Sequence, residues 1–430
     1  MLTPKKFARS YIVLLSIFIY MYWFESLDRM AIQYFLLSAL NVVSIVLIPF
    51  IFKNIEIKTI IRDPLVISFS GYLIFAFLSM IMSINLLVSL ERIGQLIVFF
   101  ITLLIFLLIL KEKLLSLNFI LSIISISLIV DIGFSLKGYI ATLNLGLDWS
   151  YLYINDILGL FGNRNIISSG ILFRIPLLIL LAIRLNRNYL YVLTFIILFI
   201  AFFDIMLLSS RAAYLGIIVC SIFGLSVILY KRFKAKNSAL KYSRVFIFLY
   251  ILPAIMAYYY ANSIIKVDDV GNINNRVSSI VSQNDESKNT RLRYYSQAIE
   301  HIGKSPLLGA GIGNWRILSI KYDKENIRNY VIPYNAHNDI LEAAAETGIL
   351  GGIFFTAFFV ILFYYQLKGF NIKSVKLYEF NCFLFSMMAF LIYMIDLNLN
   401  FPSARPFNFY LLLFLISIIH ISNSKVNEKK

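Results

Sequence analysis

The sequence is poor in charged residues and in the residue types that build disulfide-rich or metal-binding proteins. Only 14% of its 430 residues are Asp, Glu, Lys or Arg, whereas about 25% is usual in soluble domains. Its two cysteines, Cys220 and Cys382, lie inside apolar runs, and there are only three histidines. A disulfide framework and a multi-histidine metal site are therefore not expected. With 60% hydrophobic residues, the composition excludes a soluble multidomain protein and favours a membrane protein.

Apolar runs long enough to cross a membrane recur along the whole chain. A helix needs about 20 residues to cross hydrocarbon roughly 30 Å thick. The segments that approach or meet this length are 10–26, 31–52, 65–85, 93–110, 117–137, 166–183, 189–208, 211–230, 245–264, 338–365, 378–397 and 406–421. They predict an all-α, polytopic helical bundle of about 12 transmembrane helices. We expect helices one to nine in 1–264, a large external loop at 265–336 and helices ten to twelve in 337–430, integrated in one membrane domain.

The basic residues alternate between successive connections. Loops that stay in the cytoplasm carry an excess of Lys and Arg. More than half of the basic residues fall in every second connection: Lys5, Lys6, Arg9, Lys53, Lys58, Arg62, Lys111, Lys113, Arg184, Arg187, Lys231, Arg232, Lys234, Lys236, Lys241, Arg244, Lys368, Lys373, Lys376, Lys425, Lys429 and Lys430. Both termini are therefore expected in the cytoplasm. The net charge of +16 follows from this topology, so nucleic acid is not an expected partner, whereas membrane lipids are.

The connection 265–336 is a polar loop of 72 residues, and loops of this length are usually functional. Apolar residues spaced by three or four recur in its middle, at Leu292, Tyr295, Ile299 and Ile302. Asn289 can cap the start of such a helix. The pattern predicts an amphipathic helix that lies on the bundle or on the membrane surface, with His301 on its exposed side.

Charged residues inside the predicted spans gather near the outer face. Such residues are costly in the membrane and usually face an interior cavity. The outer set is Asp131, Asp204, Arg211, Asp339, Glu342, Glu346 and Asp396, and Arg174 lies nearest mid-depth. An ion path would need polar groups through the full depth, so the pattern favours a cavity that opens outward. Arg174 is alternatively explained by a structural pair with an acid.

The first motif is Ser209-Ser210-Arg211, at the outer end of a span hairpin. An arginine can bind a phosphate bidentately, which a lysine cannot. The alternative is an interfacial arginine that reaches toward lipid phosphates.

The second motif joins Arg291 and Arg293 to the glycines of 309–313 in the long loop. The glycines do not form a dinucleotide fingerprint, because no strand precedes them and their spacing is different. They indicate a tight turn where backbone packs closely. The two arginines are candidate phosphate ligands, or else a solvated helix face.

The third motif places His337 and Asn338 at the start of span ten, followed by acids at 339, 342 and 346 on one helical face. A histidine beside carboxylates can serve as a general base or as a phosphate ligand. Glu342 is a second candidate base. A purely structural histidine is the alternative.

The order of these motifs resembles that of the O-antigen ligase and O-antigen polymerase superfamily of bacterial membrane glycosyltransferases. The matching elements are Ser210-Arg211 at a span start, an arginine with the Pro-Leu-x-Gly-x-Gly turn at 306–311, and the His-Asn-x-x-Leu…Glu-x-Gly-x-x-Gly segment at 337–351. The matching arginine is Arg291 or Arg293, and Arg291 is preferred. The segment 162–165, which contains Arg164, is also similar. The twelve-span layout covers nearly the whole chain, and the distinctive motifs cover about 207–216 and 289–352.

The resemblance implies a glycosyltransferase on the outer face of the bacterial cytoplasmic membrane, without metal or other cofactor. Its donor would be a glycan on undecaprenyl diphosphate, and its acceptor the lipid A core or another surface glycan. His337, Arg211 and Arg291 would be catalytic. The diphosphate or sugar would be bound by Arg293, Arg174, Arg164, Asn338, Glu342 and Glu346.

Three other functions compete with a ligase. The polymerase branch would use the same site with another lipid-linked glycan as acceptor, and a third branch glycosylates Ser or Thr of proteins. A transporter of lipid-linked glycans is the alternative from another class. Transporters often contain repeats with helices broken at the midplane, and the sequence contains no internal repeat.

Overall fold

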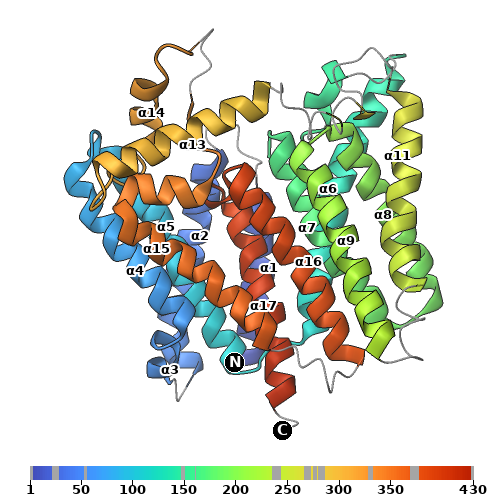
Figure 1. Ribbon diagram of the computed structural model, residues 1–430. Coiled ribbons are helices and arrows are strands. Elements are labelled where there is room, and N and C mark those ends of the chain that lie inside the picture. Colours follow the sequence, from blue (N-terminus) through green and yellow to red (C-terminus); the bar gives the residue numbers. More distant parts are fainter. Residues whose placement is uncertain are drawn as a thin grey trace. The chain divides into compact units, whose positions relative to one another are not determined.

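The computed structural model describes residues 3–21, 29–52, 56–146, 151–159, 161–234, 244–265, 273–274, 278, 286–327, 333–368 and 377–427. Within these ranges the chain forms helices and no strand (Figure 1). The α-helices are α1 Pro4–Tyr20, α2 Arg29–Ile51, α3 Ile57–Ile61, α4 Pro64–Ser79, α5 Leu86–Lys111, α6 Leu117–Asn144, α7 Arg164–Leu185, α8 Asn188–Leu208, α9 Arg211–Lys234, α11 Leu252–Ile264, α13 Glu286–Lys304, α14 Trp315–Asp323, α15 Asp339–Lys368, α16 Leu377–Leu399 and α17 Pro406–Asn427.

The predicted polytopic bundle is confirmed. Among the described residues, 11 helices are long and apolar enough to cross a membrane. They coincide with the second to twelfth predicted spans. The first predicted span, 10–26, corresponds to α1, which has 17 residues and ends at Tyr20; residues 22–26 lie outside the described ranges.

Helix starts follow local sequence signals. The side chains of Thr3, Asp63, Asn85, Ser116 and Asn163 each accept a backbone N–H in the first turn of the helix that follows. Such caps satisfy donors that the helix itself leaves unpaired. Pro4 and Pro64 occupy first turns, where a missing N–H costs nothing.

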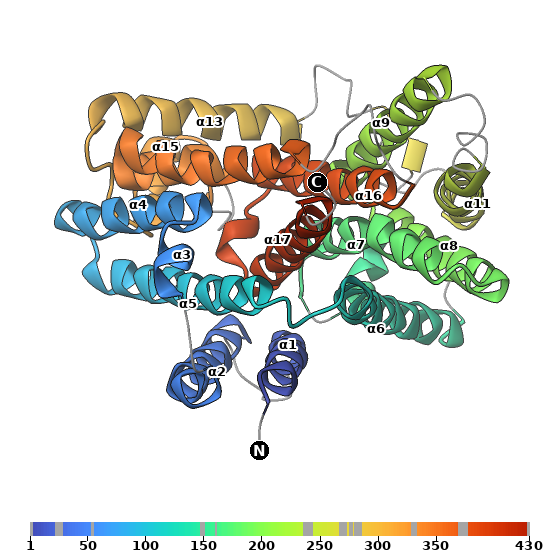
Figure 2. The same ribbon diagram turned by 90° about the horizontal axis from the view of Figure 1, so that it is seen from below.

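The chain divides into two compact units. The first contains residues 1–115, 286–365 and 397–417, and thus α1 to α5, the external helices α13 and α14, and most of α15 and α17. In this unit α1 packs on α2, and α5 packs on both α2 and α4. Figures 1 and 2 show α4 beside α5.

The second unit contains residues 116–285, 366–396 and 418–430. Its central helix is α7, which packs against α6, α8 and α9; Figure 2 shows α6, α7 and α8 side by side. Every residue from Ile166 to Ala182 is buried. A helix that is apolar on all sides belongs in the interior, so α7 forms the core of this unit.

The helix predicted in the long loop is present as α13. It packs on α14 around a small core of Ala298, Trp315, Ala336 and Ala345. The expectation that His301 is exposed is wrong: its side chain lies near Trp315 and Tyr322, and only 8% of the residue is exposed. Leu292 and Ile299 are instead more than half exposed, at 54% and 57%. The buried residues of α13 include Tyr294, Gln297, Ala298 and His301. Of the predicted apolar residues, Ile302 packs against the small core, whereas Leu292 and Ile299 lie on the exposed side.

Candidate functional site

The predicted tenth span is interrupted at Gly348. Its backbone (φ 78°, ψ 173°) is not helical, and it divides α15 into 339–347 and 349–368. The second part has 20 residues, enough to cross the hydrocarbon layer by itself. Asp339, Glu342 and Glu346 therefore lie on a short helical segment before the break at Gly348.

The glycine-rich turn of 306–311 packs into this break. Ala310 and Gly311 donate backbone N–H groups to the carbonyls of Ala345 (2.8 Å) and Glu346 (3.0 Å), and Ile349 donates to Pro306 (2.8 Å). Groups left unpaired by a broken helix must find partners at membrane depth. The turn supplies these partners, and so attaches the external loop to α15.

His337 lies directly before α15 in a left-handed conformation, with φ 57°. Hydrogen bonds hold the chain on both sides of it. On one side the Ala336 N–H donates to Glu342 Oε2 at 2.6 Å. On the other, Asn338 Oδ1 caps the helix by accepting from Ile340 and Leu341, both at 3.0 Å.

The His337 ring lies in an aromatic setting. It stacks near Tyr294, with ring centres 6.1 Å apart, and meets the Phe401 ring edge-on at 5.4 Å. The ring forms a hydrogen bond with the backbone of Leu399. Its Nδ1 atom is buried without a partner among the described residues. Burial, together with the positive charge of Arg291, lowers the pKa of His337 to about 4, so the imidazole is neutral at physiological pH.

Tyr295 ties this turn to the end of α16. Its hydroxyl lies 3.0 Å from the His337 carbonyl and 2.6 Å from the Asn398 carbonyl, and either can accept its proton. Asn338 Nδ2 donates to Asn398 Oδ1 at 3.2 Å. Segments from α13, α15 and α16 thus meet around His337.

The two loop arginines have different surroundings. Arg293 forms a bidentate ion pair with Asp323, at 2.7 and 3.3 Å. Asp323 is only 2% exposed and also accepts from Gln297 Nε2 at 2.8 Å. Arg291 instead lies close enough to His337 for its charge to lower the pKa of that ring. Arg291 therefore lies near His337, whereas the ion pair of Arg293 with Asp323 joins α13 to α14.

Each acid of the segment 339–347 accepts a backbone N–H from a different part of the first unit. Asp339 Oδ2 accepts from Ser403 at 2.7 Å, Glu346 Oε1 from Trp315 at 3.1 Å, and Glu342 Oε2 from Ala336 at 2.6 Å. These contacts join three loops to one short helical segment.

Arg92 of α5 is the residue of this cluster that sequence reasoning missed. Its guanidinium donates to the carbonyl (3.1 Å) and hydroxyl (3.3 Å) of Ser403. Arg92 lies one residue before the predicted span 93–110. A basic residue between two apolar runs is the sequence signal that could have identified it. The loop that contains Ser403 is therefore held by Arg92 of α5 and by Asp339 of α15.

In the second unit, the N-termini of α7 and α9 lie together. Ser210 donates its hydroxyl to Asn165 Oδ1 at 3.0 Å, and Asn163 caps α7 through Asn165 and Ile166. Ser209 adopts a left-handed conformation (φ 50°) that ends α8. Arg211 begins α9 and Arg164 begins α7. Arginines at helix N-termini, where unpaired N–H groups gather, suit anion binding.

Arg174 is fully buried in the same unit. Its guanidinium forms an ion pair with Asp131 and donates to Ser127 Oγ (3.2 Å) and to the Gly170 carbonyl (2.8 Å). The structure thus places Arg174 in a buried ion pair that links α6 to α7.

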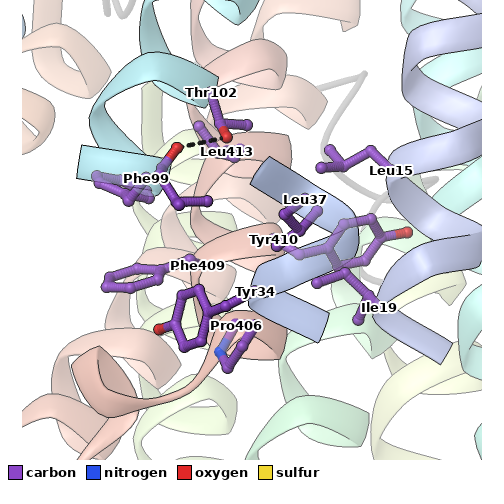
Figure 3. Close-up of a pocket in the computed structure, with 11 residues that line it drawn as sticks. Leu15, Ile19, Tyr34, Leu37, Phe99, Thr102, Pro406, Phe409, Tyr410 and Leu413 are labelled. Carbon is purple, nitrogen blue, oxygen red and sulfur yellow. Dashed lines mark hydrogen bonds between the residues drawn. The ribbon is translucent and has the colours of Figure 1, made fainter. Parts of the chain in front are cut away.

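A small pocket of about 20 Å³, lined mainly by apolar side chains, lies elsewhere in the first unit (Figure 3). Residues of α1, α2, α5 and α17 line it, among them Leu37, Phe99 and Phe409. The Tyr34 hydroxyl is buried without a partner among the described residues. None of the predicted site residues lines this cavity.

One family model matches the chain. It is described as O-antigen ligase and covers residues 193–356. The matched segment runs from α8 into α15 and contains Arg211, Arg291 and His337, whereas Arg164 and Arg174 lie before it. No curated protein matches the chain.

Proposed function

We propose that the chain, which the O-antigen ligase family model matches over residues 193–356, is a ligase acting at the outer face of the bacterial cytoplasmic membrane. It transfers a glycan from undecaprenyl diphosphate to the lipid A core or to another surface acceptor. Members of this superfamily are glycosyltransferase-like ligases and polymerases. The observation that carries the proposal is the neutral, partly buried His337 beside Arg291; the ring nitrogen Nδ1 of His337 has no hydrogen-bond partner among the described residues.

His337 is proposed to act as the general base. A neutral imidazole has one ring nitrogen with a free lone pair. This nitrogen takes the proton of the acceptor hydroxyl as the acceptor oxygen bonds to the anomeric carbon of the donor sugar. The bond from that carbon to the diphosphate oxygen breaks in the same step, and the diphosphate leaves with the electron pair.

The diphosphate requires cationic groups, because negative charge develops on its leaving oxygen. Arg291 is proposed to supply such a group. Arg211 and Arg164, at helix N-termini of the second unit, are proposed separately as phosphate ligands. Arginine pairs with phosphate oxygens through two hydrogen bonds, so the proposed reaction needs no metal ion. Asn338, Glu342, Glu346, Arg293 and Arg174 all contact other protein groups, which favours supporting roles for them.

The polymerase branch is the second candidate, because the matched superfamily contains both activities. It would use the same residues with a lipid-linked glycan as acceptor. Protein O-glycosylation would likewise differ only in its acceptor.

Deleting the gene and profiling surface glycans and lipid-linked intermediates distinguishes these functions. Full-length polymer accumulating on undecaprenyl diphosphate indicates a ligase. A single repeat unit on the lipid A core indicates a polymerase. An intermediate trapped on the cytoplasmic side would contradict both and favour a transporter.

Variants then test the site. Arg211→Lys and His337→Ala are expected to abolish transfer while the protein still inserts into the membrane. His420→Ala, near the end of α17 and far along the chain from every motif, is the matched control and should transfer normally. Normal transfer by both site variants would remove the assignment.

A further inference from the structure

The left-handed conformation of His337 requires support from its surroundings. A non-glycine residue rarely adopts φ near +57°, and such conformations persist only where neighbouring contacts enforce them. Asn338, which caps α15, fixes the chain after His337. The chain before it is held by the contact from Ala336 to Glu342.

Glu342 is well placed for this task. Its own N–H donates to the Asn338 carbonyl at 2.9 Å, so it stands in the first turn of a capped helix. Its side chain then reaches back over His337 to the Ala336 N–H at 2.6 Å, shorter than the usual 2.9–3.0 Å of such bonds.

Ala336 is a suitable anchor for the turn. It is fully buried and belongs to the small core that also contains Trp315 and Ala298. Glu342 therefore connects the position of His337 to the packing of the external loop on α15.

We infer that Glu342 is a positioning residue for His337: it acts through the Ala336 N–H and does not itself touch the substrate. The expected loss of transfer rests on the proposed function. The contact by which Glu342 fixes the backbone at His337 does not depend on that function. A positioning role also separates the two candidate bases of the third motif, because only His337 would then move a proton.

Substitutions of Glu342 distinguish a role in positioning His337 from a role as the base. Glu342→Gln keeps an oxygen that can accept the Ala336 N–H but can no longer serve as a base. Glu342→Ala removes the acceptor. Glu342→Asp keeps the carboxyl group but shortens the side chain by one methylene group. Glu325→Ala, an exposed acid of the same loop, is the control.

Two measurements are made on the full-length chain. The first is the rate at which diethyl pyrocarbonate modifies His337 in purified protein, followed by mass spectrometry of its peptide. The second is transfer of surface glycan in the deletion strain. Glu342→Ala and Glu342→Asp are expected to change the modification rate several-fold and to reduce transfer by about 100-fold, the cost of misplacing a catalytic group by about 1 Å. Glu342→Gln and the Glu325→Ala control should match the protein without substitutions in both measurements.

Loss of transfer in Glu342→Gln, with an unchanged modification rate, would show that Glu342 acts on the substrate and would overturn the inference. Unchanged modification in Glu342→Ala and Glu342→Asp would overturn it as well. If Glu342→Ala does not accumulate, Glu342→Asp decides the outcome. In another outcome, Glu342→Ala changes the modification rate of His337 while transfer is unaffected in both Glu342→Ala and His337→Ala. That result would refute the proposed function and leave the positioning role intact.

Discussion

At the scale of single residues, the charge state of His337 decides what it can do. Burial and the Arg291 charge both oppose its protonation and lower its pKa to about 4, against about 6.5 for a free histidine. The neutral form therefore predominates at every pH above about 5. Only this form can accept a proton from an acceptor hydroxyl.

The rate of His337 modification by diethyl pyrocarbonate, which attacks neutral imidazole, should consequently decline only as the pH falls through about 4. Arg291→Gln removes one cause of the lowered pKa and should shift the midpoint of this profile upward. A midpoint near 6.5, the value of free histidine, in the unmodified protein would contradict the burial of the ring.

Arg293 illustrates a role that only the structure could assign. Its partner Asp323 lies 30 residues along the chain, and no local pattern connects the two. Arg293→Ala leaves a buried carboxylate without its cation, which should cost about 1–3 kcal/mol and open the packing of α13 on α14. Limited proteolysis of the external loop should detect the change. Arg291→Ala should instead leave proteolysis unchanged and impair transfer, and equal effects of both variants would contradict this division of roles.

At the scale of helices, the positions of the spans could be predicted because hydropathy and length determine which segments cross a membrane. The break in α15 could not. Gly348 stands in an apolar run that is also compatible with a straight helix, and its contact Leu307 lies 41 positions upstream. The sequence therefore predicts one straight span over 338–365, whereas the acids at 339, 342 and 346 lie before a break in the helix at Gly348.

Replacing Gly348 by alanine tests the docking of the 306–311 turn. The new Cβ would lie 2.1 Å from the Leu307 carbonyl oxygen, and φ is +78°. The strain should cost about 2 kcal/mol or more and lower the thermal unfolding temperature in detergent, with loss of transfer. Gly94→Ala, in a helix with open space around it, is the control and should be neutral or slightly stabilising. A Gly348→Ala protein as stable as the control would show that the turn does not depend on this contact.

At the scale of the whole molecule, the distribution of basic residues predicts the topology on which the outer-face function depends. Both native cysteines, Cys220 and Cys382, are buried, so a Cys220→Ala/Cys382→Ala background gives little labelling by itself. Single cysteines can then be placed at exposed sites of predicted inner connections, Glu112 and Arg187, and of predicted outer connections, Leu145 and Glu325.

A membrane-impermeant maleimide should label the Leu145→Cys and Glu325→Cys proteins in intact spheroplasts. The Glu112→Cys and Arg187→Cys proteins should react only after permeabilisation, because loops rich in Lys and Arg remain in the cytoplasm. Protection of Glu325→Cys in intact cells would place the loop that carries Arg291 on the cytoplasmic side. His337 lies directly before the capped start of α15, to which this loop is attached, so it would move with the loop. Such a result would refute the alternation of spans and, with it, transfer at the outer face.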